Sequence, residues 1–307
     1  MTLSINNQQN MPSLHAATAQ RMFEAVPDTE FTKQISRYVY AVGFINAKFP
    51  TLNLEKELYQ NSLTGNNETQ LAMLENINDD IALQRLNRNN QLYQTLFKGL
   101  SLAKNRYIAR NMHWILDNRY NEQMFTLHTP TDELLTQCIT ALGRAQNDDA
   151  GQVVIVGQLQ PSNAVLVQAI VPVSALPFGE VLQEENQGKD QFKNLVKEIT
   201  SLDISAGDTD STRALNYTLY NNPTIYQQSY HLCYQSRRDG PNPNGYQLIN
   251  VDADTSQSGD RLVADVIFTY QGINTGAMQF WRSRVDVTGE YPFMVSCWEQ
   301  YLPNNQS

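Results

Sequence analysis

The stretch NRYIARNMHWILDNRYNEQMFTLH holds the residues of this chain that are best suited to chemistry. His113 and His128 flank a polar NRYNE segment, and a hairpin turn midway between them would make them cross-strand neighbours on one face. Two imidazoles supply half of a tetrahedral zinc site, and Cys138 in the next predicted helix would add a thiolate. The alternative is structural, with one histidine exposed and the other at a strand end. The same pairing predicts that Trp114 lies opposite Leu127, so its indole fills the core and needs a partner for its N–H.

Two arginines in the same stretch could bind an anion. Arg106 and Arg110 are four residues apart and therefore share one face if the segment is helical. A guanidinium group can bind a carboxylate through two parallel hydrogen bonds, so the pair could hold the C-terminus of a peptide. Together with Trp114, these arginines are the candidates for a peptide-binding site. The alternative is an ion pair with Glu55, Glu57 or another acidic residue of the chain.

The sequence contains no glycine-rich phosphate loop, no GxSxG elbow, no HExxH and no kinase signature. DADTSQSGD matches a calcium loop only in part, because Gln257 stands where the turn requires glycine and Val263 where a bidentate glutamate is required. A polar hairpin loop explains this stretch. Cys138, Cys233 and Cys297 are too few and too scattered for a disulfide framework, and each is predicted to be a buried, reduced thiol.

Composition narrows the class of protein. The chain has 307 residues, of which 41% are hydrophobic and 17% charged, and its net charge is -9. The negative charge and the lack of a basic run argue against binding of nucleic acid through phosphate contacts, and an acidic surface repels anionic membranes. Neither a signal peptide nor a run of membrane-spanning length is recognisable. We therefore expect a cytoplasmic protein.

The pattern of apolar residues predicts the α+β class. We expect a mixed sheet with flanking helices in the first half, and a helix pair with an antiparallel sheet in the second. The predicted organisation is a flexible tail at 1–33, an α+β domain at 34–179, a linker at 180–210, the helix pair and sheet at 211–302, and a short tail at 303–307.

Several elements are well marked. TPTDELLTQCITALGRA predicts a helix that is capped by Thr129 or Thr131 and ends at Gly143. RYVYAVGFINAKF, GQVVIVGQLQ and AVLVQAIVPVSAL predict strands that are apolar on both faces and therefore covered on both.

The second half has two further patterns. Arg282, Arg284 and Asp286 alternate along one predicted strand and Asp265 lies on its neighbour, which predicts a solvated cross-strand charge ladder. The helix pair carries five tyrosines, which either pack in the core or face a partner: Tyr217, Tyr220, Tyr226, Tyr230 and Tyr234.

Four stretches, in this order, carry a family resemblance: RYVYAVGFINAKFPTLNLEKELYQ, NRYIARNMHWIL, TRALNYTLYNNPTIY and FWRSRVDVTGEYPFMV. They resemble the C-terminal domain of the cyanobactin maturation proteases, over about Arg37 to Tyr301. The resemblance implies a setting in the biosynthesis of ribosomally made, modified peptides. It implies no established activity, because the family's domain is not the catalytic one and the protease motifs are absent here. Family members tend to have cysteine before the tryptophan, where this chain has His113, so metal binding through that cysteine would need an imidazole instead.

Two functions follow as expectations. The first is a non-catalytic accessory protein without a cofactor, which binds a precursor peptide or a peptide-modifying enzyme. The second is an unrecognised metal-dependent enzyme that uses His113 and His128 with zinc.

Overall fold

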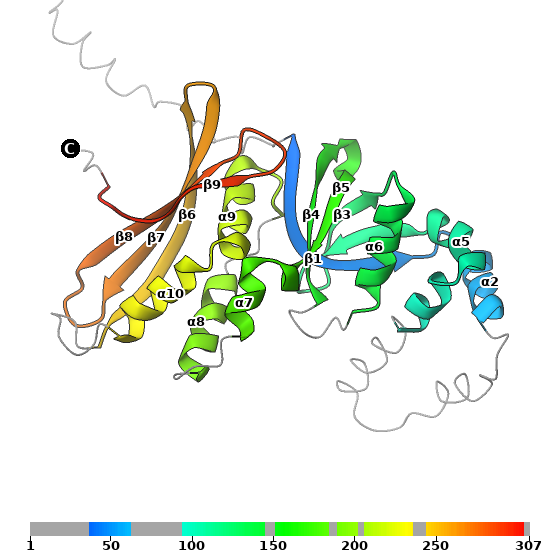
Figure 1. The fold of residues 1–307 in the computed structure, drawn as a ribbon, viewed down its shortest axis with the longest axis horizontal. Helices are drawn as coiled ribbons and strands as arrows, with labels where there is room; N and C mark the ends of the chain where they lie inside the picture. The colour runs from blue at the N-terminus through cyan, green and yellow to red at the C-terminus, as the bar shows by residue number, and fades with distance from the viewer. Residues whose placement is uncertain are drawn as a thin grey trace, which may run out of the picture. The chain divides into compact units, whose positions relative to one another are not determined.

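The fold is given by a computed structural model, which describes residues 37–62, 94–144, 151–183, 189–201, 206–235 and 244–303 (Figure 1). The predicted tail at 1–33 lies outside the described residues, as does most of the predicted tail at 303–307. The described residues form helices together with one mixed and one antiparallel sheet, which confirms the α+β class. No helix among them is long and apolar enough to cross a membrane.

Five strands of the first half close into a barrel in the order β1-β2-β3-β5-β4. All neighbours are antiparallel except β3 and β5, whose parallel pairing completes the ring. The strands are β1 (Tyr38–Lys48), β2 (His113–Asp117), β3 (Gln123–His128), β4 (Val153–Gln160) and β5 (Ala164–Pro172). The sequence predicted a mixed sheet; that it closes on itself is a finding of the structure.

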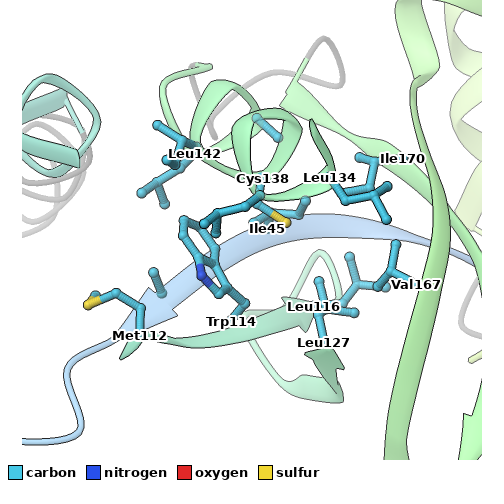
Figure 2. Close-up of a cluster of buried hydrophobic side chains, with 14 of the residues drawn as sticks. Ile45, Met112, Trp114, Leu116, Leu127, Leu134, Cys138, Leu142, Val167 and Ile170 are labelled. Atoms are coloured by element: carbon cyan, nitrogen blue, oxygen red, sulfur yellow. The ribbon is translucent and has the colours of Figure 1, made fainter. Parts of the chain in front are cut away.

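The barrel interior is filled by alternate side chains of its strands and by one helix. From β1, Val39, Ala41 and Ile45 are buried in this core. The helix is α6 (Asp132–Leu142), which packs on β1 and β5 and buries Leu134, Cys138 and Leu142 among the barrel side chains (Figure 2). Its cap is Thr131, whose side chain accepts a hydrogen bond from the backbone N–H of Leu134, and Gly143 ends it, both as predicted.

Further helical segments of the first half precede α6 in the chain. They are α2 (Leu52–Ser62), a helical segment at 94–100, the single 3₁₀ turn η2 (Ala103–Asn105) and α5 (Arg106–Asn111). Asn105 is fully buried and fixes two of them, because its side chain donates to the Gly99 carbonyl at 2.8 Å and accepts from Asn61 at 2.8 Å. The start of α5, and with it the position of Arg106, is thereby anchored.

The second half consists of helices on one face of a four-stranded antiparallel sheet of order β6-β7-β8-β9 (Figure 1). The strands are β6 (Tyr246–Ser258), β7 (Arg261–Gly272), β8 (Met278–Asp286) and β9 (Phe293–Tyr301). The helices are α7 (Pro177–Gln183), α8 (Lys189–Ser201), α9 (Asp210–Asn221) and α10 (Thr224–Tyr230), the last running on into a π-turn at His231–Gln235. The segment predicted as a linker, 180–210, contains α8, whose Leu195, Val196 and Ile199 are buried.

Helix α9 contacts both the barrel and the sheet. It packs on β1 and also on β6, β7 and β8. Asn216 is fully buried and donates to the Tyr40 carbonyl at 2.9 Å, while the Tyr40 N–H donates to the Gly207 carbonyl at 3.0 Å. Gly207 has φ +67°, and a Cβ there would lie 2.0 Å from the Tyr40 carbonyl oxygen, so this approach requires glycine.

A second core lies under the sheet. It joins Tyr40 and Val42 of β1 and Val154 and Val156 of β4 to the inner side chains of β7, such as Val266. Strands β1 and β4 are therefore buried on both faces, which their apolar sequences predicted. Of the five tyrosines of the helix pair, Tyr220 and Tyr226 are fully buried in this second core, and the other three, Tyr217, Tyr230 and Tyr234, pack against it. The tyrosines therefore pack in the core, which was one of the two predicted alternatives.

Candidate functional site

The hairpin with the two histidines has the predicted register. Trp114 of β2 lies opposite Leu127 of β3. The indole is 3% exposed and sits beside Cys138 in the barrel interior (Figure 2), and its Nε1–H donates to the Ala109 carbonyl at 2.9 Å. Trp114 is thus a core residue with the N–H partner that burial demands.

The two histidines lie on the outer face of the β2–β3 hairpin, opposite to the face that carries Trp114. Both are exposed; His113 lies opposite Lys48 of β1, and His128 opposite Leu166 of β5. Because successive side chains of a strand point to opposite faces, His113 points away from Trp114 and so from Cys138. Burial raises the pKa of the Cys138 thiol to about 12, which keeps it protonated at neutral pH. The structure therefore separates Cys138 from the histidines.

A metal site needs more ligands than this pair. In the part of the chain that the structure describes, no three His, Cys, Asp or Glu side chains group closely enough to hold a metal ion. The zinc hypothesis therefore has to be tested as a site in which His113 and His128 are the ligands that the described residues provide. An open hollow of about 470 Å³ lies beside His128, lined by Thr126, Gln160, Pro161, Ser162, Ala164 and Leu166.

The two arginines of α5 bind a carboxylate of the protein itself. Arg110 donates to both oxygens of Asp132, with Nη2–Oδ2 at 2.8 Å and Nε–Oδ1 at 3.2 Å. Arg106 donates to the hydroxyl of Thr136 at 2.7 Å and to the Asp132 carbonyl oxygen. The hydrogen bond from Arg110 lowers the pKa of Asp132. This is the ion-pair alternative of the sequence analysis, with a carboxylate in the first turn of α6, where the helix dipole also favours negative charge.

The charge ladder of the second sheet is present in part, because Asp286 is buried and pairs with Arg261 at 3.7 Å instead. Asp265 on β7 accepts from Arg282 at 3.1 Å and from Arg284 at 3.0 Å. Arg282 also donates to Glu299 of β9 at 2.7 Å and lies over the ring of Tyr301, 5.1 Å from its centroid. These contacts tie three strands together on one face of the sheet.

The two edges of this sheet differ in chemistry. On β6, the exposed carboxylates of Asp252 and Asp254 hinder pairing with another strand. The only charged residue of β9 is Glu299, which is paired with Arg282. Phe293 and Val295 of β9 are 47% and 48% exposed, and no strand of the described residues pairs with its free edge.

More apolar surface surrounds β9, since Tyr291 before it and Leu302 after it are also exposed. No sequence motif marked this strand as a binding site. Its low charge was visible in YPFMVSCWEQYL, but its place at an edge depends on strand order, which the sequence does not reveal.

The strand itself is held firmly. The Cys297 carbonyl oxygen accepts from Asn222 at 2.6 Å and from the hydroxyl of Ser283. The Trp298 ring stacks on Trp281 with centroids 5.4 Å apart and an interplanar angle of 9°. An edge strand that is fixed in this way and pairs with no other strand of the described residues on its outer side is suited to accepting a further strand.

These features define an α+β protein in which a small barrel precedes a sheet with an open edge. The chain belongs to the PatG domain family: residues 38–213 match the family described as "PatG Domain", and residues 182–301 match the one described as "PatG C-terminal". This confirms the predicted resemblance as one to a PatG-type domain of unknown function, which fits a setting in cyanobactin maturation.

A solved structure titled "PatG Domain of Unknown Function" has the same fold. The TM-score is 0.54 at 16% identity, covering 87% of this chain and 99% of that chain. At this identity the likeness concerns the fold alone. No curated protein is significantly similar in sequence.

Proposed function

We propose that this protein is a non-catalytic accessory factor in the maturation of ribosomally made, modified peptides, and that it binds an extended peptide by adding it as a strand along β9. The observation that carries the proposal is the edge of β9, which pairs with no strand in the described part of the chain and carries exposed Phe293 and Val295. The family membership of the chain supports the setting but leaves the role open.

Strand addition suits an unmodified precursor peptide. A peptide in extended form offers a continuous row of N–H and C=O groups, and main-chain hydrogen bonds to β9 would provide affinity with little demand on sequence. Exposed Phe293 and Val295 would contact alternate side chains of the added strand and favour apolar and β-branched residues there. Such a mode fits a partner whose sequence varies.

Charge further restricts the peptide. The stretch 176–307 carries 9 Lys and Arg against 16 Asp and Glu, so the half that contains β9 is acidic. A peptide with positive charge at its ends is attracted by this field, whereas an acidic one is repelled. The binding is therefore expected to weaken as ionic strength rises.

A matched pair of variants tests the proposal. The probe is a fluorescein-labelled peptide in which valine and threonine alternate between terminal lysines, and its anisotropy reports binding. Val295→Lys puts a charge on the β9 edge and is expected to weaken binding at least about tenfold. Ile249→Lys is the control, because Ile249 on β6 is 49% exposed, like Val295, but lies on the opposite edge.

A second peptide with proline at its centre controls for strand formation, because proline cannot donate a ladder hydrogen bond. It is expected to bind more weakly than the probe. Equal effects of the two lysine variants, or no binding of the probe to the wild-type protein, would contradict the proposal.

A further inference from the structure

Two buried polar atoms lie near the C-terminal end of α6, one on the helix and one just after it. The Nη1 of Arg144 and the Oε1 of Gln137 are buried and have no hydrogen-bond partner among the described residues. Other arginines of the chain, including Arg110 and Arg282, bond a carboxylate of the protein. A buried donor and a buried acceptor without partners are unfavourable, and native proteins rarely leave them so.

Both side chains line the same hollow. It has a volume of about 240 Å³ and lies between α6 and the strands β4 and β5. Gln137 lies on α6, whereas Arg144 follows the last helical residue, Leu142, by two positions. The rest of the lining is made by Thr136, Thr140, Ala141, Val153, Ile170 and Pro172.

The lining specifies the chemistry of a ligand. Arg144 requires an acceptor, and a carboxylate is the group that a guanidinium binds best. Gln137 Oε1 requires a donor, such as an amide N–H. Val153, Ile170 and Pro172 offer an apolar wall. A carboxylate, a backbone N–H and a small apolar side chain occur together at the C-terminus of a peptide.

Size limits how much of the peptide enters. Sites for drug-sized ligands have volumes of about 300–1,000 Å³, so a hollow of about 240 Å³ fits one terminal residue. We infer that the hollow lined by Gln137 and Arg144 binds the C-terminal residue of a peptide that ends in a small apolar side chain. This is a second site, and the inference does not depend on strand addition at β9.

Three small probes test the inference on the full-length protein by heteronuclear NMR. N-acetyl-L-valine carries the carboxylate, the N–H and the side chain; N-acetyl-L-valinamide lacks the carboxylate; isovalerate keeps the carboxylate and the side chain but lacks the acetamido group with its N–H. N-acetyl-L-valine is expected to shift the amide signals of α6 saturably in the millimolar range. The other two probes are expected to bind at least about tenfold more weakly, which corresponds to a loss of one contact of about 1.4 kcal/mol.

Variants assign the site. Arg144→Gln removes the guanidinium and Gln137→Met keeps the side-chain length without the acceptor; each is expected to weaken N-acetyl-L-valine at least about tenfold. Arg110→Gln is the matched arginine variant, and it is expected to leave this binding unchanged. Val295→Lys is likewise expected to leave it unchanged, so failure at β9 and failure at this hollow can be told apart.

Three results would overturn the inference. The first is equal binding of the acid and the amide. The second is the absence of a saturable shift up to about 20 mM probe, which would mean that water alone serves the two atoms. The third is loss of binding in Arg110→Gln with binding kept in Arg144→Gln, which would place the carboxylate on the arginine pair of α5.

Discussion

Arg110 and Asp132 form a bidentate ion pair, with Nη2–Oδ2 at 2.8 Å, that joins α5 to the first turn of α6. Arg106 and Arg110, which the sequence offered as a binding site for a peptide carboxylate, thus contact Asp132 of the protein itself. Their role in binding a peptide stays a prediction, which requires that a ligand carboxylate compete with Asp132.

This ion pair predicts a pH dependence. The pKa of Asp132 is lowered in the folded protein, chiefly by the hydrogen bond from Arg110, so the folded state favours the charged carboxylate. Its contribution to stability is present above the ordinary pKa of aspartate and is lost as the pH falls through the lowered value. Urea midpoints of wild type and Asp132→Asn should differ modestly at pH 7 and converge towards pH 3, because exposed pairs contribute little. A difference that stays constant over this range would contradict the assignment.

Trp114 is predicted to be a stability residue. Removing a buried tryptophan leaves a cavity, so Trp114→Ala should lower the free energy of unfolding by about 3–5 kcal/mol. Trp114→Phe retains most of the apolar volume and loses the bond to the Ala109 carbonyl, so a smaller loss is expected. Urea unfolding followed by circular dichroism measures both. A Trp114→Ala protein as stable as wild type would show that the indole does not fill the barrel core.

The three cysteines are predicted to differ in reactivity. Cys297 is exposed, whereas Cys138 and Cys233 are buried. Since the thiolate is the reactive form, a thiol reagent at pH 8 should modify Cys297 quickly and the other two only after unfolding. Cys297→Ser should abolish the fast phase. The prediction that all three are buried is wrong for Cys297, because this residue lies on an edge strand.

The raised pKa of Cys138 predicts that the free energy of unfolding falls at alkaline pH. Its pKa rises from 9.0 to about 12 on folding, so the folded state favours the neutral thiol. Stability is unaffected below about pH 9 and falls as the pH rises from there towards 12, because only the unfolded chain can release the proton. Cys138→Ala should flatten this part of the urea-midpoint profile. An unchanged slope in that variant would assign the alkaline loss to other groups, such as buried Tyr40, whose pKa is also raised by burial.

Zinc binding has a direct test at the two histidines. Structural zinc sites have four protein ligands, and the described residues around His113 and His128 provide no third His, Cys, Asp or Glu. Zinc should therefore be substoichiometric in protein purified without chelator, and His113→Ala with His128→Ala should leave it unchanged. One zinc per chain, lost in both variants, would contradict this prediction and support the metal-enzyme hypothesis.

Local signals in the sequence predicted much of this fold. The register that pairs Trp114 with Leu127 follows from turn position and strand alternation, and the cap at Thr131 from helix chemistry. Non-local features were not predictable. Closure of the barrel depends on the parallel contact of β3 with β5, and the partner of Arg110 lies on another helix. The open edge of β9 depends on strand order, and the unpaired atoms of Gln137 and Arg144 emerge only when α6 is packed.

The most direct test of peptide binding at β9 is hydrogen–deuterium exchange of the full-length protein with and without the valine–threonine probe. Backbone N–H groups on the free edge of β9 exchange readily unless another strand accepts their hydrogen bonds. We predict that saturating probe slows exchange in the peptide fragments that span residues 293–301 and leaves β6 unchanged, and that the same probe concentration slows exchange less in Val295→Lys. Probe binding with no change in β9, or with protection at β6 instead, would contradict it.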